Sequence, residues 1–390
     1  MYKRILNNVL SELDGASCFI FGPRQTGKST ILKDRKADLY IDLLSHENFL
    51  KYSNDPDILW REIKQLPKQK QEVIIDGEQK VPAILDVVHR AIEDFKHIHF
   101  LLSGSSMRKI RRGAANLLGG RAINLNLFSL THEELADDFN LEEVLEYGSL
   151  PQISSLLAEN NKLLAAEMLN SYVATYLLDE IKAEAIVRSL ASFQSFLRVA
   201  ASQYAKEINF SAIASNSRLP QSSINNYYSI LEDTLIGFFL EPYTRSIRTR
   251  LSKRKKFYFY DNGVARAILG LEGSIASPEE RGNLFEQWLI AEAQRINSYY
   301  RKKLTFNFWR TSSGAEVDLL ISRANKILLA IEIKSDKNIA KRDCSGLFSF
   351  HRENPKVPCY ICAPVDQEQS LEKNIELITP QTLTTMIKQA

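Results

Sequence analysis

The sequence has little cysteine, little net charge and no long apolar run. Its net charge of +3 gives no general attraction for nucleic acid, so only a local basic cluster can indicate such a partner. The apolar segment Leu235–Leu240 is far shorter than the roughly 20 residues of a membrane-spanning helix. Residues 1–8 lack the apolar stretch of a secretory signal. We therefore expect a soluble, cytoplasmic protein with no membrane partner.

The four cysteines include one C-x-x-C pair, Cys359 and Cys362, a spacing found in redox sites and in half of a zinc site. The pair lies in an apolar stretch that predicts a buried strand, with no second Cys/His pair nearby in the sequence. Because small thiols are common in protein cores, we interpret both cysteines as core residues.

One short segment carries the clearest chemical signal, a complete G-x-x-x-x-G-K-S phosphate loop. An apolar run, Cys18–Phe21, precedes it and Ile31-Leu32 follows, so a buried strand is expected to enter the loop and a helix to leave it. The glycines let the backbone approach phosphate, the lysine reaches the β- and γ-phosphates, and the serine hydroxyl binds Mg²⁺. The expected ATP-binding residues are Gly22, Pro23, Arg24, Gln25, Thr26, Gly27, Lys28, Ser29 and Thr30.

The pattern along the chain predicts an α/β fold in three parts. Residues 1–155 alternate strands with helices, which indicates a parallel sheet of the P-loop NTPase type covered by helices. Residues 156–270 read as a helical lid and winged-helix module, and residues 271–390 as a mixed α/β domain. The five N-terminal strands are expected at Ser17–Phe21, Ala37–Asp42, Glu72–Ile75, Ile98–Ser103 and Ala122–Leu127.

A phosphate loop works with an acid at the end of a neighbouring strand, and Asp76 ends the expected strand Glu72–Ile75. We predict that Asp76 holds Mg²⁺ together with Ser29. A carboxylate that orients the attacking water commonly follows directly, but here Gly77 comes first and Glu78 second. We assign the catalytic role to Glu78, because a glycine permits a local bulge that re-aims the next side chain.

Two further partners of an ATP site are expected. A polar side chain at the tip of the strand Ile98–Ser103 is assigned to Ser105, with Ser103 as second choice. Arg121 stands just before the fifth strand, where a cation reaches the site of a neighbouring subunit; a surface salt bridge is the alternative. Weaker candidates for the same role, or for contact with nucleic acid in a pore, are Arg108, Arg111 and Arg112.

With these motifs the sequence resembles the prokaryotic AAA-type ATPases that carry a conserved, uncharacterised C-terminal region. The resemblance covers nearly the whole chain and departs from the family pattern at Gly77, where the family usually has the catalytic Glu. It implies an AAA+ core that acts as a ring oligomer, commonly a hexamer. The matching segments are 22–30, 75–82, 102–106, 120–121, 128–135, 148–151, 257–263 and 314–318.

The middle of the chain contains a helix–turn–helix pattern. A short helical segment from Phe210 is followed by a second helix over 221–232 that bears base-reading residue types. Seven basic residues within Arg245–Lys256 then occupy the position of a wing and suit a phosphate backbone. We expect DNA contact here, with packing or oligomerisation as the alternative role. The polar residues proposed to face bases are Gln221, Ser222, Asn225 and Asn226.

The C-terminal region places acids on two expected strands. Asp318 lies on one, while Glu332 and Lys334 share a face of the next because side chains two residues apart point the same way. Glu286, on a helix, can supply a further acid. The D-(x)n-E-x-K pattern is the core of restriction-endonuclease-like (PD-(D/E)xK) nucleases, whose acids bind Mg²⁺. We predict that fold; the alternative for Glu332 and Lys334 is a simple salt bridge.

Together the patterns predict an ATPase that binds ATP and Mg²⁺ and couples turnover, as a ring, to DNA. Two alternatives stay open: a nucleotide-gated assembly protein with little hydrolysis, and a metal-dependent nuclease regulated by ATP. A protein substrate is also compatible with the sequence.

Overall fold

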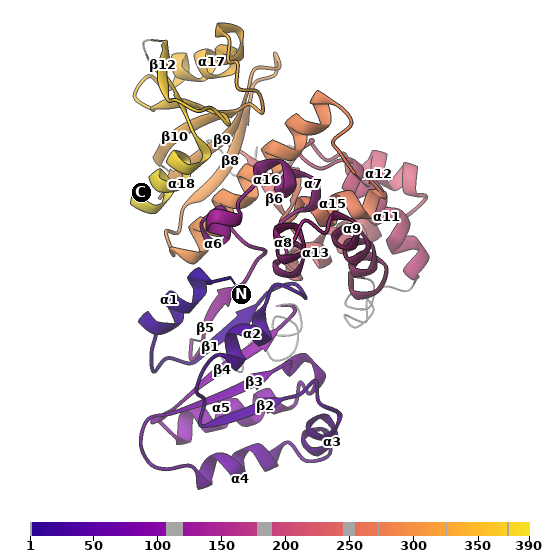
Figure 1. Cartoon of the computed structure of the whole chain (residues 1–390), viewed down its shortest axis with the longest axis vertical. Coiled ribbons are helices and arrows are strands. Elements are labelled where there is room, and N and C mark those ends of the chain that lie inside the picture. The colour runs from indigo at the N-terminus through magenta and orange to yellow at the C-terminus, as the bar shows by residue number, and fades with distance from the viewer. Residues whose placement is uncertain are drawn as a thin grey trace.

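The computed structural model describes residues 2–106, 120–177, 189–244, 254–271, 273–324, 326–372 and 374–390. A five-stranded sheet with its helices forms one end of the molecule, a helical region lies in the middle, and an eight-stranded sheet forms the other end (Figure 1). Within the described ranges, no helix combines the length and the apolarity that crossing a lipid bilayer requires.

The N-terminal sheet has the strand order β2-β3-β4-β1-β5, and all of its neighbouring strands are parallel. The central strands are buried along their whole length, as expected for a parallel sheet covered by helices. The strands are β1 (Cys18–Phe21), β2 (Leu39–Asp42), β3 (Gln71–Asp76), β4 (Ile98–Gly104) and β5 (Ile123–Asn126). The helices are α1 (Ile5–Glu12), α2 (Lys28–Lys33), α3 (His46–Asn54), α4 (Asp57–Gln65), the 3₁₀ turn η1 (Glu78–Lys80) and α5 (Ile84–Asp94).

The register brings the strand ends that bear the motifs to one edge of this sheet. Asp76 at the end of β3 pairs with Asp42, and Phe21 at the end of β1 pairs with Gly104 and with Asn126. Because the strands are parallel, the phosphate loop after β1 and the polar residues after β3 and β4 emerge side by side.

The middle region is helical and ends in a β-hairpin. Local capping explains several helix starts: the Thr131 hydroxyl accepts from Glu134 N–H in a capping box, and Asp261 caps α15 through Val264 N–H. The elements before the hairpin are α6 (His132–Leu135), η3 (Ala136–Asp138), α7 (Leu141–Tyr147), α8 (Pro151–Ala158), α9 (Lys162–Ser171), η4 (Tyr172–Leu177), α11 (Leu190–Ser202), α12 (Phe210–Ser217) and α13 (Gln221–Asp233). The hairpin is β6 (Gly237–Pro242) with β7 (Lys256–Phe259), and α15 (Asn262–Leu269) follows it.

The hairpin joins the C-terminal sheet, whose order is β12-β13-β11-β10-β9-β8-β6-β7. One hydrophobic core therefore runs from Leu130 to Ile387, through the middle and C-terminal regions together. The remaining strands are β8 (Thr305–Arg310), β9 (Glu316–Arg323), β10 (Lys326–Ile333), β11 (Cys359–Cys362), β12 (Gln369–Glu372) and β13 (Ile375–Ile378). The remaining helices are α16 (Pro278–Tyr299), the 3₁₀ turn η5 (Lys341–Cys344), α17 (Ser345–Glu353) and α18 (Pro380–Gln389).

The predicted fold class is confirmed: a parallel sheet at the N-terminal end, helices in the middle and a mixed sheet at the C-terminal end. The five N-terminal strands lie within two residues of the expected ranges at each end. Cys359 and Cys362 are buried on β11, as the interpretation as core residues requires, and burial raises the pKa of the Cys359 thiol to about 11.

Candidate nucleotide-binding site

The phosphate loop connects β1 to α2. Gly27 adopts a φ of +93° directly before α2, a backbone conformation that favours glycine. Gly22 is required for a different reason: a Cβ there would lie 2.2 Å from the carbonyl oxygen of Leu127. The Lys28 ammonium donates to the carbonyl oxygens of Gly22 (2.6 Å) and Pro23 (2.7 Å), so its charge lies over the loop. The loop thus presents backbone and cation in the arrangement expected of a phosphate cradle.

The acid predicted for Mg²⁺ lies at the neighbouring strand end. Asp76 Oδ1 accepts a hydrogen bond from the Ser103 hydroxyl, and Asp76 Oδ2 accepts one from Tyr40 at 3.1 Å. Burial and the Asp76 charge raise the pKa of Tyr40, so this hydroxyl stays protonated and donates. Ser103, the second choice for the polar strand tip, is therefore the serine that contacts Asp76. Ser105 is buried in the turn after β4.

Gly77 and Glu78 show how the chain accommodates the displaced carboxylate. Gly77 has a φ of +81°, and its N–H donates to Ser103 Oγ at 3.0 Å. After this left-handed turn Glu78 begins η1 and is only 2% exposed. Its Oε1 lies 2.4 Å from where a Cβ on Gly104 would stand, and Gly104 accepts from Gly22 N–H at 3.3 Å. The Glu78 carboxylate therefore lies against Gly104 at the end of β4, the residue that also bonds Gly22 at the start of the phosphate loop.

A cavity of about 360 Å³ adjoins the loop. Its walls come from three parts of the chain: the segment before and within α1, the phosphate loop with α2, and the start of α8. The helices after residue 155 were expected to form a lid, and α8, which begins at Pro151, borders this cavity. The lining includes Tyr2, Arg4, Asn7, Gln25, Gly27, Thr30, Ile31, Asp34, Pro151, Gln152 and Ser155.

Arg121 lies on the surface and forms an ion pair with Glu93 of α5. This is the surface salt bridge named as its alternative role; the proposed contact with another subunit stays a prediction. Arg108, Arg111 and Arg112 lie outside the described residues.

In the C-terminal region, one of the predicted acids, Glu286, meets a second carboxylate, Glu316, at a lysine. Lys256 of β7 is buried, and its ammonium pairs with Glu286 at 3.0 Å and with Glu316 at 2.6 Å. Glu286 also accepts from the Tyr258 hydroxyl at 2.6 Å. Asp318 accepts from the backbone N–H of Ile333. Within the described parts of the chain, no group of three or more His, Cys, Asp and Glu residues is arranged to hold a metal ion.

A second lysine–carboxylate ion pair lies in the same cluster. Lys334 pairs with Glu332 at 2.9 Å, the salt bridge named above as the alternative. Burial, opposed in part by Lys334, raises the pKa of Glu332 to about 6, and burial together with Glu332 raises that of Asp318 well above its ordinary value. Because Glu286 pairs with Lys256 and Glu332 pairs with Lys334, two of the three acids expected to bind Mg²⁺ have a lysine as partner instead.

The helix–turn–helix pattern corresponds to α12 and α13, followed by the β6–β7 hairpin. Gln221, Ser222 and Asn225 are exposed on α13, whereas Asn226 is half-buried. The basic cluster is smaller than expected from the sequence, because Lys256 is buried in ion pairs and Lys255 pairs with Glu241. The basic residues at 245, 248, 250 and 253 lie outside the described residues.

Three contacts at these sites were not found by sequence reasoning. Tyr40 binds Asp76 from the neighbouring strand, Lys256 enters the C-terminal acids from the hairpin, and Arg4 donates to the carbonyl oxygen of Thr26 in the phosphate loop. Each contact joins elements that are far apart in the sequence, so no local spacing of residues could have predicted it.

Comparison with protein families divides the chain into three matched segments. Residues 15–136 match an AAA domain. Residues 138–274 and 281–383 match two domains of unknown function, DUF8612 and DUF4143. These matches confirm the expected AAA domain and a C-terminal family domain of uncharacterised function; the winged helix and the nuclease-like fold stay predictions. No match was found among curated proteins.

Three solved structures show a distant similarity to the chain. The Aeropyrum pernix ORC1 protein, solved in complex with DNA, is 11% identical over 67% of this chain and 90% of its own, with a TM-score of 0.30. The Aeropyrum pernix ORC2 protein, solved as ADPNP-ADP complexes, is 15% identical over 68% and 90%, with a TM-score of 0.38. The Bacillus subtilis DNA clamp loader delta protein is 12% identical over 58% and 86%, with a TM-score of 0.27. Likeness at this level concerns the fold alone.

Proposed function

We propose that the chain binds ATP with Mg²⁺ on residues 22–30 and Asp76 and hydrolyses it. The observation that carries this proposal is the meeting of three groups at one sheet edge. The Lys28 ammonium lies over the phosphate loop, the Ser103-bound Asp76 ends the next strand but one, and the Glu78 carboxylate reaches Gly104 beside Gly22. A cation, a metal-binding acid and a second acid are the parts that hydrolysis of a triphosphate requires.

Each residue then has one task. Lys28 and the loop amides hold the β- and γ-phosphates, and Ser29 with Asp76 fits Mg²⁺, which takes few protein oxygens and keeps phosphate and water as its other ligands. Bound Mg²⁺ supplies charge neutralisation of the phosphates. Glu78 accepts a proton from, or orients, the attacking water, and the Ser103 hydroxyl fixes the rotamer of Asp76. The cavity beside the loop takes the nucleoside.

We further propose that turnover is coupled to DNA in a ring oligomer, with a hexamer favoured and Arg121 contributed to the neighbouring site. Support for DNA comes from α13, where Gln221, Ser222 and Asn225 are exposed and of types that hydrogen-bond to base edges. A nuclease function is not favoured, because two of the three acids proposed to bind its metal already pair with lysines, Glu286 with Lys256 and Glu332 with Lys334.

Steady-state ATP turnover by the wild type, Lys28→Ala and Glu78→Gln tests the catalytic proposal. We expect Lys28→Ala to lose nucleotide binding, and Glu78→Gln to keep ATP affinity while losing about 100-fold or more in kcat. Wild-type binding without turnover would leave the nucleotide-gated assembly protein as the function. Turnover that survives Glu78→Gln would show that another group orients the water.

The DNA proposal is tested by repeating turnover with double-stranded DNA at several salt concentrations. We expect stimulation that weakens with salt and is reduced in Asn225→Ala, but not in Asn124→Ala, an exposed asparagine of the N-terminal sheet. Equal turnover with and without DNA would contradict this coupling and direct the search to a protein substrate.

A further inference from the structure

Arg4 is a buried cation beside the phosphate loop that the proposed catalytic roles do not include. It lies just before α1, is 5% exposed, and directs its guanidinium at four acceptors. One acceptor is the carbonyl oxygen of Thr26, inside the phosphate loop. A second is the carbonyl oxygen of Phe128 at 2.8 Å, and a third is the Tyr299 hydroxyl at 3.2 Å. The fourth is Glu134 at 3.0 Å.

The contact with Thr26 has a direct stereochemical consequence. The peptide between Thr26 and Gly27 is trans, so its C=O and N–H point in opposite directions. With the carbonyl oxygen held by Arg4, the Gly27 N–H is turned away from the guanidinium. The Lys28 ammonium lies on the inner side of the loop, where it donates to the carbonyl oxygens of Gly22 and Pro23. Fixing this peptide fixes one of the amides of the cradle before any ligand arrives.

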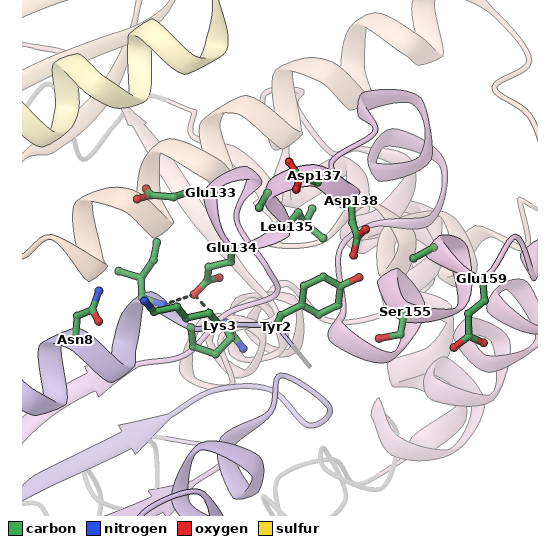
Figure 2. A pocket seen from close by; sticks show the side chains of 14 residues that line it. Tyr2, Lys3, Asn8, Glu133, Glu134, Leu135, Asp137, Asp138, Ser155 and Glu159 are labelled. Atoms are coloured by element: carbon green, nitrogen blue, oxygen red, sulfur yellow. Dashed lines mark hydrogen bonds and ion pairs between the residues drawn. The ribbon is translucent and has the colours of Figure 1, made fainter.

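Arg4 is itself held by a buried anion. Glu134 has no exposed side-chain surface; its Oε1 accepts from Arg4 and from Ile5 N–H at 2.8 Å, and its Oε2 accepts from Thr131 N–H at 3.1 Å. Figure 2 shows Glu134 between Lys3 and Leu135, on the wall of a second cavity of about 700 Å³. The Tyr2 ring lies along the same wall and points towards Asp138 (Figure 2). A buried pair of this kind fixes orientation more than it stabilises the fold.

The third acceptor, the Tyr299 hydroxyl, extends the connection to α16, the long helix whose last residue packs into the core of the N-terminal sheet. Tyr299 is the last residue of α16, and its hydroxyl also accepts from the backbone N–H of Phe128 at 3.0 Å. Arg295 and Glu292 lie one and two turns earlier on α16 and bind the same stretch, Arg295 through Ser129 and Glu292 through His132. Three residues of α16 thus form hydrogen bonds with the segment 128–134, which is part of one of the sequence motifs. Arg4 connects this bonded segment to the phosphate loop.

We propose that Arg4 is a positioning residue for the phosphate loop, which orients the Thr26–Gly27 peptide for the triphosphate and couples nucleotide binding to α16 through Tyr299. This inference rests on the proposed function, since it concerns how the same loop is held. It adds a partner within the chain: α16, which responds to, and influences, the occupied loop through Tyr299.

The test is a set of equilibrium titrations of the full chain with a fluorescent ATP analogue in Mg²⁺, at a temperature where every variant is folded by circular dichroism. Arg4→Lys keeps the charge beside Glu134 but cannot reach all four acceptors. Arg4→Met combined with Glu134→Gln removes both charges, so that no buried carboxylate is left unpaired. We expect both to bind the analogue about 10-fold or more weakly, as loss of charge-assisted hydrogen bonds implies. Arg35→Met, at an arginine of the same sheet domain that pairs with Glu72, is the matched control and should bind like the wild type.

A double-mutant cycle tests whether Arg4 and Tyr299 act together on nucleotide binding or whether each substitution merely destabilises the fold. Tyr299→Phe should weaken binding about 3-fold in the wild type and have no effect when Arg4→Met and Glu134→Gln are already present. Tyr300→Phe removes the neighbouring hydroxyl, which bonds Glu133, and serves as control. Wild-type affinity in both Arg4 variants, or a Tyr299→Phe effect of equal size in both backgrounds, would overturn the inference. Failure of the wild type itself to bind the analogue would instead overturn the proposed function.

Discussion

At the residue scale, Gly77 sets the direction of the Glu78 carboxylate, which we propose orients the attacking water. The sequence interpretation left open whether Glu78, one position late, reaches the phosphate loop. The left-handed φ of +81° at Gly77 provides a turn that other residues rarely adopt, and Gly104 leaves the space that the Glu78 carboxylate fills. The sequence departs from the family pattern at Gly77, where the family usually has a Glu. The turn at Gly77 nevertheless brings the Glu78 carboxylate to Gly104, which bonds the start of the phosphate loop.

Replacing Gly77 by alanine tests this arrangement. A Cβ at Gly77 would lie 3.1 Å from the Leu44 side chain, and the positive φ adds about 1 kcal/mol of strain. We expect kcat to fall at least about 10-fold as Glu78 shifts, with KM for ATP unchanged. Gly120→Ala is the matched control, because Gly120 has a φ of +77° and, among the residues that the structure describes, nothing within 4 Å of its Cβ position. Equal effects of the two substitutions would argue against the account.

Glu72 gives a pH-dependent prediction. Burial acts to raise its pKa, but hydrogen bonds from His99 and Arg35 outweigh it and lower the pKa to about 2. A lowered carboxyl pKa adds stability above the unfolded value near 4.5, and this stability is lost as pH falls towards 2. We expect Glu72→Gln to cost about 2 kcal/mol at pH 7, discounted for partial exposure. The difference from wild type in melting temperature should narrow between pH 5 and 3; a constant difference would contradict the assignment.

At the scale of elements, β7 joins the two ends of the molecule. Its first residue, Lys256, lies among the C-terminal acids, and Asp261, just after the strand, accepts from Ser149 N–H at 2.9 Å near the phosphate loop. A cavity wall shared by Pro23, Thr26 and Asp261 places the two sites on one continuous structure. The hairpin expected as a DNA-binding wing thus also has a structural task.

Lys256→Gln is predicted to destabilise the C-terminal sheet. Removing the ammonium leaves the half-buried Glu286 without a cation and Glu316 with only the exposed Arg310, a loss of about 3 kcal/mol at pH 8. The penalty should shrink towards pH 5 as carboxyl groups with raised pKa values, Glu332 at about 6 among them, take up protons. Lys255→Gln, at the neighbouring lysine with a more exposed partner, should change the urea midpoint little. A Lys256→Gln protein equally stable at both pH values would refute the role of Lys256 as counter-ion.

Elements with strong local signals could be predicted, and contacts between distant elements could not. The buried strands and the phosphate loop follow from short apolar runs and glycine spacing, so their ranges are nearly correct. The choice between Ser103 and Ser105 depends on strand register, because only Ser103 faces Asp76 across the sheet. The engagement of Lys256 requires β7 to pair into a sheet formed mainly by residues after 300. Arg4 gives no sequence signal, because each of its acceptors lies at least 22 residues away.

At the scale of the whole molecule, Gly148 and Gly263 form a joint between the end of α7 and the start of α15, two segments of the middle region that are distant in sequence. Gly148 has a φ of +73°, and a Cβ there would lie 1.9 Å from Asp261 Oδ1; a Cβ on Gly263 would lie 1.9 Å from the carbonyl oxygen of Tyr147. The two segments therefore dock through backbone, and Asp261 accepts from Ser149 and Val264 N–H. Contact at this distance tolerates no side chain at either glycine.

Gly148→Ala should consequently lower stability by about 3 kcal/mol or more, because the clash lies in a close-packed interior. Gly270→Ala has a similar φ of +67° with nothing near its Cβ position, so it reports the backbone strain alone. Melting temperatures of the two variants provide the comparison. A Gly148→Ala protein as stable as Gly270→Ala would show that the joint can open without cost.

The central claim is that residues 22–30 bind ATP, and isothermal titration of the full chain with ATP and Mg²⁺ tests it most directly. The wild type should bind with one site per chain, Lys28→Ala should show no measurable binding, and Lys33→Ala, at an exposed lysine of the same helix, should bind like the wild type. Absence of binding in the wild type, or binding that survives Lys28→Ala unchanged, would contradict the account.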